Sequence, residues 1–200
     1  MTGALTGCNA AWVATATNVL LPALKVAIMA IATFVTTLNG KTLTQSFVNA
    51  VNKVTTDAVA TIGNVMTLVG EFATDPSPTL LGKISDLLTA LVSSLSQIMT
   101  GVSISDPATV SKLTMLISLA VAAAQAVLAI IPVVQTAMPA LATMSDAQKL
   151  SLSSRTDKRL KNAHQELADE YEAIRTEPTA NADVNAALAA LPATLTPAAA

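Results

Sequence analysis

The side chains that could perform chemistry are few, and they gather in one stretch near the C-terminal end of the chain. His164 is the only histidine, and Glu166, Asp169 and Glu170 follow it closely. On a helix only residues three or four positions apart share a face, and none of these carboxylates stands at a recognised metal-ligand spacing from His164. A general base also needs a partner that orients it. We therefore expect His164 to be a partly packed boundary residue that neither catalyses a reaction nor binds a metal.

Sequence motifs of catalysis are missing as well. The chain has no nucleophile elbow, no glycine-rich phosphate loop and no His-Glu-x-x-His motif. A four-helix di-iron site needs two Glu-x-x-His pairs, which one histidine cannot supply. No convergent polar anchors for a bound ligand are visible between the helices either. The sequence therefore predicts a non-enzymatic protein without a cofactor, a metal or a small-molecule substrate.

Cys8 is the only cysteine, so the chain cannot form an intrachain disulfide or a cysteine-based zinc site. The residues Leu5-Thr6-Gly7-Cys8 resemble a bacterial lipobox, in which the cysteine is lipidated. This resemblance implies that Cys8 is acylated and that the protein lies at a membrane or in the cell envelope. Only seven residues precede Cys8, and they contain neither a basic region nor an apolar one. The alternative is a small buried apolar cysteine in a soluble or virion protein.

Charge and aromatic content argue against nucleic-acid binding. The net charge is -2, and aromatic residues make up only 2% of the chain. Residues 1–144 hold five Lys/Arg and five Asp/Glu, while residues 145–200 hold six and eight. Neither part has the basic excess of a nucleic-acid binder, and there are too few aromatic rings to stack single-stranded bases. We expect no nucleic-acid partner.

The charges of the C-terminal part are sorted by sign along one segment. Its first half is basic and its second half acidic: Arg155, Lys158, Arg159 and Lys161, then Glu166, Asp169, Glu170 and Glu172. This order opposes the helix dipole, which favours acids at the start and bases at the end. Two such helices laid antiparallel would place basic half against acidic half, so the segment predicts self-association or docking on a similarly polarised protein. The alternative is a solvated face with local pairs such as Asp157 with Lys161.

Apolar stripes of helical period position this segment and fill the rest of the chain. Apolar residues recur at alternating steps of three and four, the pattern of helices that pack against helices. The stripes of the first four segments are Leu20, Leu24, Ala27, Ile31, Phe34 and Leu38; Phe47, Val51, Val54, Ala58, Ile62, Val65, Val69 and Phe72; Leu81, Ile84, Leu88, Leu91, Leu95, Ile98 and Val102; and Val110, Leu113, Ile117, Ala120, Ala124, Val127, Ile131 and Val134.

Capping and breaking residues set the expected boundaries. The helix starts are predicted by a capping box of Thr42 with Gln45, by Ser77 before Pro78, by Asp106 before Pro107, and by a capping box of Ser145 with Gln148. Asn39-Gly40 should end the first helix, because both residues tolerate the left-handed conformation. We expect Pro22 to bend the first helix, and Pro132 and Pro139 to kink or end the fourth.

These patterns predict an all-α fold, an up-and-down antiparallel bundle of four long helices joined by short loops. A charged fifth helix and a short C-terminal helix with a flexible tail follow it. The expected parts are residues 1–144 for the apolar bundle, 145–177 for the charged helix and 178–200 for an Ala/Pro-rich tail. Within the last part a helix is expected from about Asp183 to Leu191, and a flexible tail from Pro192.

One question of burial stays open at this stage. Leu113 to Val134 is uncharged and long enough to cross a bilayer, but its alanine content favours a buried bundle helix. The first and fourth segments are apolar enough to need cover on several sides, from more helices or from lipid.

The leading functional expectation is a structural or protein-interaction subunit of a larger bacterial or phage-related assembly. The alternative is a membrane-tethered, lipoprotein-like protein, or a membrane-active one of the pore-forming or holin-like kind.

Overall fold

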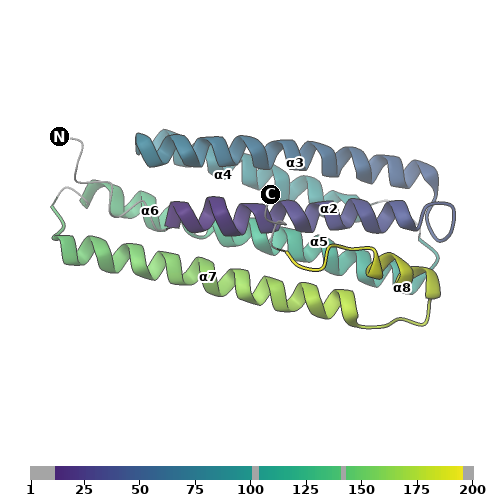
Figure 1. The fold of residues 1–200 in the computed structure, drawn as a ribbon. Coiled ribbons are helices and arrows are strands. Elements are labelled where there is room, and N and C mark those ends of the chain that lie inside the picture. Colours follow the sequence, from purple (N-terminus) through teal and green to yellow (C-terminus); the bar gives the residue numbers. More distant parts are fainter. Residues whose placement is uncertain (1–11, 101–103, 141–142, 196–200) are drawn as a thin grey trace.

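Figure 1 shows the computed structural model of the protein, which describes residues 12–100, 104–140 and 143–195. A π-helical stretch η1 (Ala16–Leu20) leads into α2 (Leu21–Thr37), and the other helices are α3 (Gln45–Thr74), α4 (Pro78–Ser96), α5 (Pro107–Leu128), α6 (Ile131–Ala137), α7 (Asp146–Thr176) and α8 (Ala182–Ala189). Short 3-10 turns follow α4 and α6, at Gln97–Met99 and Met138–Ala140. In the described ranges there is no strand, only an isolated bridge between Asn39 and Leu43. The predicted all-α bundle is confirmed.

Four helices form the central part of the bundle. α2 packs against α3 and α5, and α4 packs against the same two helices from the other side. Short connections join neighbouring ends, so α2, α3, α4 and α5 run in alternating directions, and α6 continues the direction of α5 (Figure 1). α7 lies along α5 and contacts η1, while α8 packs on α2 and α7. The extra cover that the first and fourth segments needed therefore comes from α7 and α8, as well as from the bundle.

The predicted stripes form the core. Every stripe residue of the first segment, and of the third up to Ile98, is buried, as are six of the eight in α3. Phe47 and Val54 are partly buried and pack against the core, and Val110 is partly exposed. Val102 lies outside the described residues.

Most helix boundaries follow the local signals. Ser77, Asp106 and Ser145 are N-caps whose side chains accept hydrogen bonds from the first turns, and Ser145 forms the predicted capping box with Gln148. Gly40 adopts φ 71°, a left-handed conformation that a side chain would disfavour. The fourth segment breaks where its prolines predict: α5 ends at Leu128, Pro132 lies in the first turn of α6, and a 3-10 turn contains Pro139.

One boundary near the first helix differs from expectation. The N-cap of α3 is Thr44 and not Thr42, because the Gly40 turn directs the Leu43 amide to the Leu38 carbonyl and helical geometry begins only at Gln45. The hydroxyl of Thr42 instead lies 2.9 Å from that of Thr109 in α5. At Pro22, which is expected to bend the first helix, the preceding turn widens into η1, where the Leu21 amide bonds to the carbonyl of Ala16. This widening accommodates a ring that cannot donate a hydrogen bond.

The C-terminal segment is also more ordered than predicted. Leu191 and Leu195 are buried, and the hydroxyl of Tyr171 donates to the Pro192 carbonyl over 2.8 Å. A flexible tail from Pro192 is therefore wrong as far as Leu195, because the apolar side chains of Leu191 and Leu195 join the hydrophobic core. Residues 196–200 lie outside the described part.

Candidate interaction surface

The charged helix α7 is fixed to the bundle by one apolar side. Leu160, Leu167, Tyr171 and Ile174 are buried, and they recur at the spacing of one helical face. At 1.5 Å per residue its 31 residues span about 46 Å. The helix therefore presents a long, straight outer side along one edge of the bundle (Figure 1).

All eight charged residues predicted for this surface are exposed. We call the outer side of α7 the charged face; its predicted members are Arg155, Lys158, Arg159, Lys161, Glu166, Asp169, Glu170 and Glu172. With a turn of about 100° per residue, most of these positions fall opposite the buried stripe, with Lys161 at one edge of the face and Arg159 and Glu170 at the other. The structure thus places the basic and acidic halves on one continuous solvated surface.

Local pairs engage only part of this face. Lys161 binds Asp157 at 2.7 Å, Arg175 binds Glu172 at 2.9 Å, and the Gln165 amide donates to Asp169 over 2.8 Å. Arg155 donates only to the backbone of its own helix. Lys158, Arg159, Glu166 and Glu170 have no ion pair in the part of the chain that the structure describes. Two bases and two acids are therefore left to face solvent.

Asp157 is the one acidic residue between Arg155 and Lys161, and its side chain turns toward the bundle. It accepts hydrogen bonds from Lys161 and from the buried hydroxyl of Thr15. The hydrogen bond from Lys161, followed by that from Thr15, lowers the pKa of the Asp157 carboxyl below its usual value. This contact ties the first half of α7 to the N-terminal helix. The helical spacing of Asp157 and Lys161 predicts their pairing, but no local pattern indicates Thr15, which lies 142 positions away.

Lys112 fixes the other end of α7. Its side chain is buried in α5, and Nζ donates to the Ile174 carbonyl over 3.2 Å and to the Glu177 carboxylate over 2.8 Å. A cation at a helix C-terminus interacts favourably with the helix dipole. The hydrogen bond from Lys112 to the Glu177 carboxylate lowers the pKa of that carboxyl. The sequence around Lys112 does not indicate its contacts with Ile174 and Glu177, because these partners lie more than sixty positions away.

His164 lies on the inner side of α7, away from the charged face. Its ring is partly buried, and Nε2 is buried with no hydrogen-bond partner among the described residues. The carboxylates that follow it in sequence, Glu166, Asp169 and Glu170, are exposed on the outer side instead. In the described ranges no three His, Cys, Asp or Glu side chains gather where a metal ion could bind. The structure does not bring the residues around His164 together into a site.

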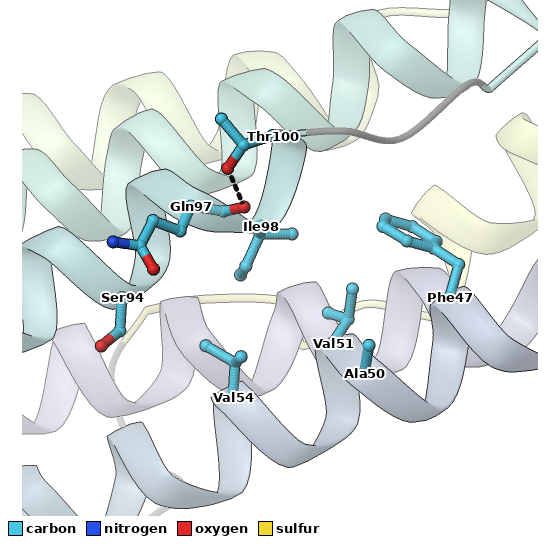
Figure 2. A pocket seen from close by; sticks show the side chains of 8 residues that line it. All are labelled: Phe47, Ala50, Val51, Val54, Ser94, Gln97, Ile98 and Thr100. Carbon is cyan, nitrogen blue, oxygen red and sulfur yellow. Dashed lines mark hydrogen bonds between the residues drawn. The ribbon is translucent and has the colours of Figure 1, made fainter.

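A shallow pocket of about 330 Å³ lies between α3 and the end of α4 (Figure 2). Phe47, Val51 and Val54 line the α3 side, while Ser94 comes from α4 and Gln97 from the 3-10 turn that follows it. Thr100 donates to the backbone carbonyl of Gln97, so its hydroxyl is already engaged. None of the eight lining side chains is an acid, a base or a thiol. The pocket therefore offers no general acid or base from its walls.

Among the described residues, two helical stretches meet the length and hydropathy of a membrane span. They are Trp12–Thr37, with a mean hydropathy of 2.1, and Pro107–Ala140, with 2.4. Within the bundle 56% and 50% of their most apolar windows are buried. Core helices of bundles show the same properties, so the finding fits both readings of these segments. Cys8, the predicted lipidation site, lies outside the described residues.

Comparison of this chain with known protein families, with curated proteins and with solved structures gives no match.

Proposed function

We propose that this protein is a non-enzymatic helical interaction protein, a subunit that joins a larger assembly through the charged face of α7. The observation that carries the proposal is the sorting of charge on an exposed helix: bases in the first half and acids in the second, all on the solvated surface. The helix dipole does not set this order, because its effect is confined to the terminal turns, where Asp146 and Arg175 already suit it. Local helix stability therefore does not account for it, whereas a partner of complementary charge does.

The way in which α7 is held supports this role. Thr15 and Asp157 fix its first half, and Lys112 fixes its last turn. Between them, Leu160 and Leu167 bury the inner side. Because the helix is anchored along its length, its charges stand at defined positions, which reduces the entropy lost on docking.

Site-specific photocrosslinking in cells tests the proposal. A photoreactive residue in place of Arg159 samples the charged face, and the matched control replaces Lys53, an exposed lysine on α3. We expect discrete crosslinked products from position 159 that weaken with added salt, because exposed charge pairs are screened. Equal products from both positions, or none from position 159, would contradict a docking role for this face.

A second candidate function rests on a different observation, the two long apolar helices at the centre of the bundle. α2 and α5 pack against each other, and each apolar stretch carries a single charge, Lys25 or Lys112. We propose as this alternative that the bundle opens on a lipid surface and exposes them. Trp12, the only tryptophan, is buried against Phe72 at a ring-centre distance of 5.7 Å and reports such opening directly.

Liposomes separate the two candidates. Insertion predicts that bromine-labelled lipids quench the fluorescence of Trp12 and that trapped dye leaks out. Unchanged fluorescence and intact liposomes would refute the membrane-active alternative and leave the interaction role standing.

A further inference from the structure

We propose that the charged face of α7 pairs with the same face of a second copy of the protein, antiparallel, about a two-fold axis between Ala163 and His164. This inference rests on the proposed function and names its partner. A two-fold interface requires that one surface be complementary to itself. The charged face meets this requirement because its bases precede the axis and its acids follow it along the helix.

The complementarity follows from comparing residues at equal distances on either side of this axis, which lie at the same level in the two antiparallel helices. Lys158 then stands opposite Asp169, near the middle of the exposed side. Lys161 lies at the level of Glu166, and Arg155 at the level of Glu172, but the members of each of these two pairs point toward opposite edges of the face and attract over a longer distance. Each pairing occurs twice in a symmetric dimer. Nearest the axis, Asn162 stands opposite Gln165, so two exposed amides meet where no charge is needed.

The remaining charges fit the same register less closely but without conflict. Arg159 is adjacent in sequence to Lys158, the residue that stands opposite Asp169. Glu170 faces the position of Asp157, yet Asp157 is turned toward Thr15 and bound to Lys161, with 18% of its side chain exposed. The like charges are therefore not placed side by side. Lys158 and Asp169, a central pair of the register, are both exposed in the single chain.

The composition of the face defines the kind of dimer. It is made of charges and amides and lacks the aromatic or large apolar anchors that dominate stable interfaces. Exposed ion pairs contribute little each, and salt screens them. We therefore expect a transient dimer whose dissociation constant is roughly micromolar or weaker. Raising the salt concentration from about 0.05 M to about 0.5 M should weaken it at least tenfold.

Charge-swap complementation, followed by sedimentation equilibrium at low salt, tests the pairing. An acidic variant carries Arg155→Glu and Lys158→Glu, and a basic variant carries Asp169→Lys and Glu172→Lys. Each should be monomeric alone, because its dimer places like charges opposite one another. An equimolar mixture should form a heterodimer, since all the swapped contacts become attractive, and a chain with all four substitutions should dimerise again.

Two controls keep the test informative. Circular dichroism shows that each variant is folded, and the swap Lys53→Glu with Asp57→Lys on α3 should leave the dimer unchanged. A wild-type protein that stays monomeric at low salt, or variants whose mixture does not associate, would overturn the pairing. If position 159 still crosslinks to another protein in that case, the proposed function survives and only the self-pairing fails.

Discussion

Replacing Lys112 with methionine removes one charge from inside the bundle and keeps the shape of the side chain. In the native protein the buried Nζ of Lys112 caps the last turn of α7 through the Ile174 carbonyl and also binds the carboxylate of Glu177. Methionine preserves most of the packing of the stem but donates no hydrogen bond. The substitution therefore isolates the contribution of the cap.

The size of the effect follows from these contacts. A hydrogen bond from a charged donor contributes about 1.5–3 kcal/mol, and relief from burying an ammonium group offsets part of that loss. The carboxylate of Glu177 is 66% exposed and can return to water, so the loss falls on the Ile174 carbonyl. We expect Lys112→Met to lower the free energy of unfolding by about 2 kcal/mol. For a domain of this size that lowers Tm by about 4–8 °C.

Thermal unfolding by circular dichroism measures the change, and hydrogen exchange locates it. Amides in the last turns of α7 should exchange faster, while those of α3 stay protected, because the cap acts at the end of one helix. The matched control is Lys53→Met, which removes an exposed lysine paired with Asp57 at 2.8 Å and should shift Tm by less than about 2 °C. A Tm of Lys112→Met as high as that of the wild type would refute the capping role.

Three further predictions concern backbone, burial and pH. Gly63→Ala should raise the free energy of unfolding by about 0.5–1 kcal/mol, because the site is helical and open, whereas Gly40→Ala should lower it by roughly 1 kcal/mol, since φ there is 71°; denaturant unfolding compares the two. Burial raises the pKa of Tyr171, the only tyrosine, to about 12, so tyrosinate absorbance should appear near that pH or with alkaline unfolding; a midpoint near 10 would contradict its burial. The lowered pKa of Asp157 means that its ionised form stabilises the fold at neutral pH, and this stabilisation is lost as pH falls through the folded pKa. Asp157→Asn should therefore lower Tm at pH 7, and the Tm of this variant should fall less than that of the wild type between about pH 5 and pH 2.

The sequence by itself determined the features that depend on neighbours in the chain. Helix starts at Ser77, Asp106 and Ser145 follow from side chains that bond within three residues. The buried stripes follow from the helical period. The same period places the charges of α7 on its outer side, because an apolar inner face leaves only one side for them.

Only the tertiary structure decided which distant residues meet. The contacts of Thr15 with Asp157 and of Lys112 with Ile174 join positions 142 and 62 apart in the chain. The sequence around Thr42 suits an N-cap, but Thr42 lies in the turn that follows Gly40 and its hydroxyl is hydrogen-bonded to that of Thr109. Leu195 is buried in the hydrophobic core although its segment reads as a tail. Such contacts depend on how whole helices pack, and no local pattern of residues encodes that packing.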